Sequence, residues 1–363
     1  MANEPELKSS TKRRALSPLM VAWGIVLISL GLAVGWVILS EPPETVSDTP
    51  TTSSVATDEP SSDPAITDEP PAMSEPASTP VTETPANNPM LATQSPLPPV
   101  PNQNLLVAGD NGLKPALGPD GLVVWKEYAR PFEGAEERPR IAILVTDVGL
   151  NSKSSQAAID NLPGQVDLAF SPYGRNLQDW MDKSRNRGHE GFLMIPTEPL
   201  NYPDSDPGPH TLVADMSERE NMSRLDWILS QVTGYVGVVN HMGSKFTASE
   251  EDMTPVITDL ASRGLMLVDA RSTRFSMAAR LARRTGMPRA MNDRYIDNNL
   301  TPSNIQNELA ELEKTANTFG AALGMARALP ITINEIAEWS KTLEQKGIDL
   351  VPVTAIANRQ PIK

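Results

Sequence analysis

Residues 234–247, GYVGVVNHMGSKFT, decide the fold class, because a run of apolar residues ends abruptly in Asn240 and His241. This pattern predicts a buried strand that carries a histidine at its carboxyl end. Roughly a hundred residues earlier, residues 141–149 (IAILVTDVG) repeat the pattern and end in Asp147, Val148 and a glycine. In parallel α/β proteins, ligands gather at the carboxyl ends of the strands. The two segments therefore predict a parallel sheet with a mononuclear metal site where Asp147 and His241 meet.

Apolar runs alternate with segments of helical periodicity downstream of Arg140. The predicted strands cover residues 141–146, 166–171, 191–195, 235–240, 265–268, 289–292, 321–325 and 350–353. The predicted helices cover residues 154–161, 177–187, 218–233, 250–263, 276–285, 302–319 and 331–346. Such alternation, with about eight strands, is typical of parallel βα units that close, or nearly close, into a barrel. An open doubly wound sheet is the alternative.

The amino-terminal segment is predicted to be a membrane anchor. Residues 19–39 form an unbroken uncharged run, and about 20 apolar residues suffice to cross a bilayer as a helix. Basic residues before this run and acidic residues after it place residues 1–18 in the cytoplasm and the rest outside. A cleaved signal peptide is the alternative, but its apolar region is usually shorter. We expect an uncleaved signal anchor and a single-pass inner-membrane protein with a periplasmic folded domain.

The next segment, residues 40–104, is rich in Pro, Ser, Thr and acidic side chains and is predicted to be a disordered linker. Residues 41–113 hold eleven acidic residues and no Lys or Arg, which accounts for most of the net charge of −14. The folded domain, expected at residues 140–363, therefore lacks the basic surface of a nucleic-acid-binding protein. Residues 105–139 are expected to dock on it, with a short strand at 122–125. The absence of cysteine excludes disulfides and thiolate zinc sites.

Polar residues leave several predicted strands at their carboxyl ends and would converge on one face of a barrel. The residues at these ends are Thr146, Asp147, Ser171, Pro172, Tyr173, Thr197, Glu198, His241, Asp269, Arg271, Asp293 and Ala326. His189 instead precedes its strand, so we expect it at the opposite face in a structural role. His210 lies in a loop rich in Pro and Gly, where it would either line a cleft or be solvated.

Several of these segments resemble the divergent polysaccharide deacetylases in order and spacing. They are IAILVTDVGL, VDLAFSPYG, GHEGFLMIPTEP, DPGPHTL, GYVGVVNHMGSKFT, LMLVDARSTRFS and, less closely, IDLVPVT, within residues 140–357. The resemblance implies a distorted (β/α) barrel related to carbohydrate esterases, which remove acetyl groups from glycans with a divalent metal. It also implies that Asp147 and His241 are metal ligands, with zinc as the expected metal. Such a metal polarises the acetyl carbonyl and activates a bound water.

Three positions depart from the family's pattern. Thr146 stands where relatives commonly carry the first of two aspartates, so the expected base is missing. Where the third strand of relatives often ends in His-x-Pro-x-Glu-Pro, this chain has Ile195-Pro-Thr-Glu-Pro, so we expect Ile195 at the place of the second ligand histidine. No histidine follows Gly324 in the last motif. The sequence therefore predicts that metal binding is weak or absent.

Other polar residues are candidates to complete the site. Glu198, Asp269 and Asp293 are candidate catalytic carboxylates, and Tyr173, Arg271 and His210 are candidate substrate-binding residues. The alternative is that the carboxylates pair with Arg271, Arg274 or Arg294 and hold loops together.

Two functions remain open from the sequence. The first is a membrane-anchored envelope protein that binds or acts on an envelope polysaccharide or peptidoglycan with degenerate catalysis, and that has a further envelope protein as a candidate partner. The second is an active metal-dependent deacetylase that hydrolyses acetyl amide or ester groups. The sequence has no nucleophile elbow, P-loop or dinucleotide-binding motif that would favour another enzyme class.

Overall fold

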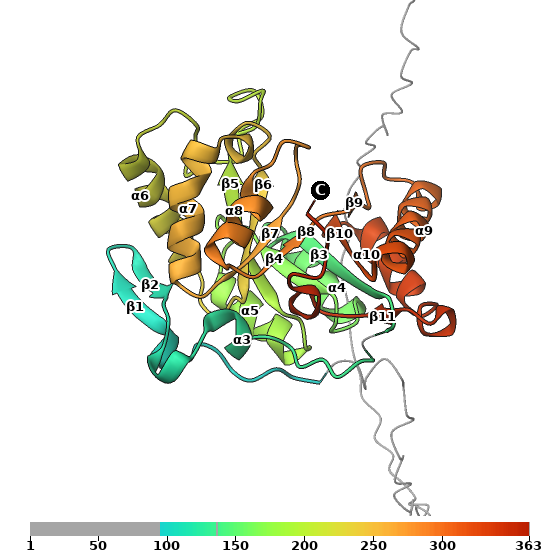
Figure 1. Cartoon of the computed structure of the whole chain (residues 1–363). Coiled ribbons are helices and arrows are strands. Elements are labelled where there is room, and N and C mark those ends of the chain that lie inside the picture. The colour runs from blue at the N-terminus through green and yellow to red at the C-terminus, as the bar shows by residue number, and fades with distance from the viewer. Residues whose placement is uncertain (1–94, 136, 363) are drawn as a thin grey trace, which may run out of the picture. The chain divides into compact units, whose positions relative to one another are not determined.

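The computed structural model of the chain describes residues 95–135 and 137–362 (Figure 1). The predicted anchor at residues 19–39 and most of the predicted linker lie outside these residues. Among the residues that are described, no helix combines the length and the apolar character needed to cross a membrane.

The described part of the predicted linker, residues 95–104, packs against the folded domain. Leu97 is 7% exposed, and its backbone N–H donates to the carbonyl oxygen of Arg185 at 2.9 Å. The Arg185 guanidinium in turn donates to the carbonyl oxygen of Pro98 at 3.0 Å. The predicted boundary at residue 104 was therefore too late, because a few apolar residues at the end of the Pro-rich segment find a buried place on the domain.

A curled sheet of nine strands forms the centre of the domain, and all of its strand pairs are parallel (Figure 1). Its order is β8-β7-β6-β5-β4-β3-β10-β9, and β11 pairs with β3. The strands are β3 (Arg140–Val148), β4 (Asp167–Phe170), β5 (Gly191–Thr197), β6 (Gly237–Met242), β7 (Met266–Asp269), β8 (Arg289–Met291), β9 (Arg294–Tyr295), β10 (Ala321–Arg327) and β11 (Asp349–Leu350). The curled sheet confirms the barrel-like prediction over an open doubly wound sheet.

A single stretch of chain brings the two ends of the sheet together. Strand β8 pairs with β7 and β9 pairs with β10, and only Asn292 and Asp293 separate β8 from β9. The Asn292 N–H donates to the carbonyl oxygen of Asp269 at 2.8 Å, and the Asp293 N–H donates to that of Leu323 at 2.8 Å. We call residues 289–295 the closing segment, because they hydrogen-bond to both ends of the sheet.

Seven helices cover the curled sheet and match the predicted helices closely. They are α4 (Ser152–Asn161), α5 (Leu177–Asn186), α6 (Glu218–Leu229), α7 (Glu250–Ser262), α8 (Ala278–Thr285), α9 (Pro302–Phe319) and α10 (Pro330–Ser340). Side chains that accept a backbone N–H cap the starts of α4 and α7, at Asn151 and Ser249. Left-handed glycines end α8 and α9, at Gly286 and Gly320.

Residues 105–139, which we call the docking segment, begin with a hairpin and continue as a helix. Strands β1 (Leu106–Gly109) and β2 (Gly112–Pro115) pair antiparallel across the turn at residues 110–111. The strand predicted at residues 122–125 was wrong, because α3 (Val124–Glu127) begins there. Val124 and Tyr128 are four residues apart and both buried, so one helical turn buries them on the same side, and no neighbouring strand is needed.

Candidate functional site

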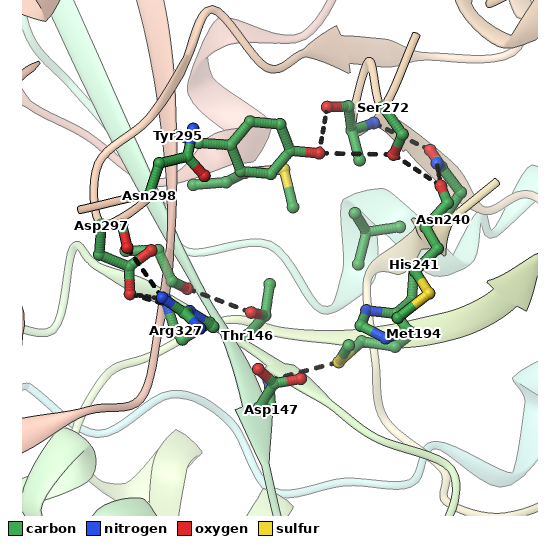
Figure 2. A pocket seen from close by; sticks show the side chains of 15 residues that line it. Thr146, Asp147, Met194, Asn240, His241, Ser272, Tyr295, Asp297, Asn298 and Arg327 are labelled. Atoms are coloured by element: carbon green, nitrogen blue, oxygen red, sulfur yellow. Dashed lines mark hydrogen bonds and ion pairs between the residues drawn. The ribbon is translucent and has the colours of Figure 1, made fainter. Parts of the chain in front are cut away.

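A cavity of about 470 Å³ lies at the carboxyl ends of the central strands (Figure 2). Residues from β3, β5, β6, β9 and β10 line it, together with the loops that follow β7 and β9. They are Thr146, Asp147, Met194, Val239, Asn240, His241, Met242, Ala270, Ser272, Tyr295, Asp297, Asn298, Met325, Ala326 and Arg327. Of the predicted site residues, the structure brings Asp147 and His241 together in this cavity.

Asp147 enters the cavity at an irregularity near the end of β3. The pairing of β3 with β4 shifts register between Val145 and Val148, and Asp147 has a left-handed backbone with φ of 66°. A bulge of this kind redirects a side chain, and aspartate tolerates this conformation better than most residues. The Asp147 N–H lies 3.3 Å from the Met194 sulfur. Burial raises the pKa of the Asp147 carboxyl, and the neighbouring His241 and Arg327 oppose that rise.

His241 lies at the carboxyl end of β6, where it pairs with Pro196 of β5. The Thr197 hydroxyl donates to the His241 carbonyl oxygen at 2.9 Å and fixes the backbone at this point. Burial lowers the pKa of the His241 ring, while Asp147 acts in the opposite direction. Burial therefore favours the neutral imidazole, which can accept a proton or bind a ligand through nitrogen. Figure 2 shows the Asp147 carboxylate with the His241 ring on one side and the Arg327 guanidinium on the other.

Arg327 and Asp297 add an ion pair to the cavity that the sequence analysis missed. Asp297 is 3% exposed, and its carboxylate accepts from the Arg327 N–H at 3.0 Å and from Nε at 3.3 Å. The Thr332 hydroxyl donates to the same oxygen at 3.2 Å. Asp297 follows the two-residue strand β9, which the predicted strands did not include. The available signal was the apolar pair Tyr295 and Ile296 directly before Asp297.

Polar groups on the other side of the cavity hold the loop that follows β7. The Tyr295 hydroxyl donates to the Ala270 carbonyl oxygen at 2.7 Å, and the Ser272 hydroxyl donates to that of Met242 at 2.6 Å. The Asn240 side chain accepts from the Ala270 N–H at 2.9 Å. These bonds fix the rim of the cavity in one arrangement.

The position of the missing histidine is Met194, not Ile195 as the sequence analysis assigned. Met194 and Pro196 pair with Val239 and His241, so they share a face of the sheet with His241. Ile195 pairs with Asn240, is 3% exposed and does not line the cavity. In the pattern His-x-Pro-x-Glu-Pro, the histidine also falls two residues before Pro196. The side chain that occupies the place of a second imidazole is therefore a thioether.

The cavity does not fit a conventional zinc site. Structural and catalytic zinc sites use at least three protein ligands. Within residues 95–135 and 137–362, no three His, Cys, Asp or Glu side chains gather in a way that could hold a metal ion. Asp297 lies in the same cavity as Asp147 and His241, but it is paired with Arg327. Weak or absent metal binding remains a prediction that metal analysis has to test.

The three candidate catalytic carboxylates lie outside the cavity lining and bond to nearby loops. Glu198 is 5% exposed and accepts from Lys245 Nζ at 3.0 Å and from the Ala214 N–H at 2.7 Å. Asp269 is 2% exposed and accepts from the Arg271 N–H at 2.8 Å and from the hydroxyl of the loop residue Ser276.

Asp293 belongs to the closing segment and accepts from the Leu323 N–H at 3.0 Å and from Gln360 Nε2 at 2.6 Å. The alternative of arginine pairing predicted Arg294 as a partner for these groups, but Arg294 pairs with Glu308 and Glu311 of α9.

The candidate substrate-binding residues also lie away from the cavity lining. The Tyr173 hydroxyl accepts from the His210 N–H at 3.0 Å, and the His210 ring stacks on Trp227 with centroids 3.6 Å apart. Arg271 has a left-handed backbone with φ of 50° in the loop after β7. His189 is fully buried before β5, and its ring nitrogens contact backbone carbonyl oxygens, as expected of a structural histidine.

Comparison with known proteins identifies relatives of the folded domain. The profile of a family described as divergent polysaccharide deacetylase matches residues 143–357. An uncharacterized protein of Haemophilus influenzae is 25% identical over 194 residues, covering 53% of this chain and 68% of that protein. The uncharacterized protein YibQ of Escherichia coli K12 is 23% identical over 223 residues, covering 61% of this chain and 69% of that protein. The crystal structure of the uncharacterized protein ATU2773 from Agrobacterium tumefaciens C58 is 38% identical with a TM-score of 0.66, covering 68% of this chain and 99% of that one.

Proposed function

The chain belongs to the divergent polysaccharide deacetylase family, and we propose that its cavity binds an envelope polysaccharide while releasing little or no acetate. The observation that carries this proposal is the pair of substitutions beside Asp147. Thr146 stands where the family pattern has a carboxylate base, Met194 stands where it has a ligand histidine, and both line the cavity. A hydroxyl does not take a proton at neutral pH, and a thioether is a poor ligand for zinc.

The remaining lining suits a sugar. Its volume of about 470 Å³ lies within the usual range for ligand pockets. Arg327, Asn298 and Tyr295 supply polar groups that can bond to sugar hydroxyl and acetamido groups. Met194, Met242 and other apolar residues offer a surface for the C–H face of a sugar ring. Such a mixture orients a ligand without requiring a reactive group.

The pair of Asp147 and His241 then acts in recognition. The neutral His241 ring can donate or accept one hydrogen bond, and the Asp147 carboxylate can accept two from neighbouring sugar hydroxyls. Arg327, whose side chain is 46% exposed, presents donors that Asp297 only partly occupies. We propose that these three side chains hold one sugar unit.

The proposed location is the cell envelope. The uncharged run at residues 19–39 and the charges that flank it favour a single-pass inner-membrane anchor with the folded domain in the periplasm. The Pro-rich segment that follows would let the domain reach a polymer at a distance from the membrane. A further envelope protein is a second proposed partner.

Binding and acetate release should be measured on the same full-length protein in detergent. We expect N-acetylated peptidoglycan fragments to bind, with no acetate release above the protein-free rate, with or without added zinc. Arg327→Gln should weaken binding roughly tenfold, the loss expected for one charged hydrogen bond. Asp204→Asn, in an exposed loop, is the matched control and should bind normally.

Zinc-dependent acetate release that Asp147→Ala abolishes would overturn the proposal and establish an active deacetylase. Unchanged affinity of Arg327→Gln would instead place the glycan outside this cavity.

A further inference from the structure

Three arginines line a second hollow. It lies at the amino-terminal end of β8, whereas the cavity lies at the carboxyl ends of the strands. Arg283 lies in the last turn of α8, Arg289 begins β8, and Arg359 lies in the carboxyl-terminal segment. The hollow measures about 640 Å³. We call it the arginine pocket, and Arg283, Arg289, Asn358 and Arg359 are the lining residues that matter for its charge. This lining contains no Asp or Glu.

Arg289 is a buried cation without a carboxylate partner in the described part of the chain. Its side chain belongs to a residue that is 7% exposed, and its Nη1 donates to the neutral Asn358 Oδ1 at 2.7 Å. Its Nε is buried and has no hydrogen-bond partner among the described residues. Buried arginine is normally paired, because an unpaired buried charge is costly. Burial and the nearby charge of Arg283 both lower the pKa of Arg289, which reflects the same unbalanced charge.

The dipole of helix α8 does not explain why Arg289 is buried without a carboxylate partner among the described residues. Basic side chains near a helix carboxyl end gain about 0.3–1 kcal/mol from the helix dipole. That explains an exposed arginine such as Arg283 in the last turn. It does not explain Arg289, because the carbonyl oxygens of Ala282 and Arg283 already accept from the N–H groups of Met287 and Gly286.

We propose that the arginine pocket binds a phosphate group. Guanidinium groups present forked donors that match the several oxygens of a phosphate, and hydrogen bonds between charged groups are the strong ones. Arg283, Arg289 and Arg359 come from three separate segments that face one hollow, so a tetrahedral anion can bond to more than one of them. The bound anion supplies the missing counter-charge for Arg289. The phosphate has two possible sources. One is free phosphate or a phosphate monoester, and the other is a phosphate diester of the kind found in phospholipid headgroups.

Calorimetric titration of the full-length protein with inorganic phosphate tests the site, with chloride at matched ionic strength as the reference. We expect saturable binding to the parent protein and at least a tenfold loss of affinity in the double variant Arg283→Gln and Arg359→Gln. Both side chains are exposed, so the variant should fold. Arg280→Gln changes an exposed arginine of the same helix outside the pocket and should bind phosphate normally.

Titration with glycerol 3-phosphate and with glycerophosphoglycerol distinguishes the sources. Binding of the monoester alone assigns a free or terminal phosphate, and binding of the diester as well assigns a headgroup. Equal affinity of the double variant and the parent protein, or no heat beyond that of chloride, would overturn the proposal.

Discussion

Two buried carboxyl groups make the stability of the folded domain depend on pH. Asp167 begins β4 and Glu190 precedes β5, and both are 0% exposed. Glu190 accepts hydrogen bonds from the Arg130 N–H at 2.7 Å and from the Thr354 hydroxyl. Asp167 accepts from the Val353 N–H at 2.5 Å. The pair therefore joins two central strands to the docking segment and to the carboxyl-terminal segment.

The direction of the pH dependence follows from the two pKa values. Burial raises the pKa of Glu190 from 4.5 to about 7. Burial, and then the charge of Glu190, raises the pKa of Asp167 well above its usual value. The folded protein thus holds protons that the unfolded chain releases, so the contribution is complete below pH 4.5 and is lost as the pH rises through about 7. At 1.36 kcal/mol per pKa unit, the Glu190 shift alone corresponds to about 3 kcal/mol of unfolding free energy.

Glu190→Gln should remove the part of this dependence that Glu190 contributes. The amide oxygen can keep the hydrogen bonds from Arg130 and Thr354, and the amide nitrogen offers a donor to the neighbouring Asp167 carboxyl. Unlike the Glu190 carboxyl, the amide does not lose a proton in this pH range. We expect the parent protein to lose about 3 kcal/mol more than the variant between about pH 5 and pH 8.

Urea unfolding followed by tryptophan fluorescence at several pH values measures the difference, provided that the urea dependence itself stays constant. Glu344→Gln, an exposed glutamate without a side-chain partner among the described residues, is the control and should follow the parent protein. Parallel pH profiles for the parent and Glu190→Gln, or a parent whose stability rises through this window, would refute the reasoning.

Three further experiments test which residue of β5 faces the proposed zinc site, how the sheet is closed and how the chain crosses the membrane. Met194→His should give a protein that retains zinc after dialysis, whereas the parent should retain less than one equivalent. Ile195→His should retain no more zinc than the parent and should destabilise the fold by about 1–3 kcal/mol, since it buries a polar ring on the other face; zinc retention by this variant alone would contradict the assigned register. Gln360→Ala should lower the unfolding free energy by about 1–3 kcal/mol, because Gln360 bonds to both the N–H and the carbonyl oxygen of Met291 and to Asp293; no loss would show that the closing segment holds without it. A reporter active only in the cytoplasm, fused after Lys363, should stay inactive, and activity there would contradict the predicted single crossing.

The sequence predicted the central elements well because their signals are local. Strand β3 and helix α9 lie close to their predicted bounds. A continuous apolar run predicts β3, and an amphipathic segment with an N-cap residue predicts α9. Strand β9 escaped prediction because two residues carry too little periodicity, and its place is fixed by pairing with β10. Because β9 was not predicted, Asp297, which follows β9 and lines the cavity, was not predicted as a site residue either. Glu198 and Asp269 looked like site residues because they lie at strand ends, but backbone N–H groups of neighbouring loops hold their carboxylates outside the cavity lining.

The one-residue difference between Met194 and Ile195 decides how the missing histidine bears on function. Had the replaced position been Ile195, the change would lie on the other face of β5 and would say little about chemistry in the cavity. Met194 instead places its sulfur 3.3 Å from the Asp147 backbone nitrogen and shares a face with His241. A thioether therefore stands beside Asp147 and His241 where the family pattern places a nitrogen ligand. This arrangement supports our proposal that the cavity, which keeps one carboxylate and one imidazole, binds a glycan and releases little or no acetate.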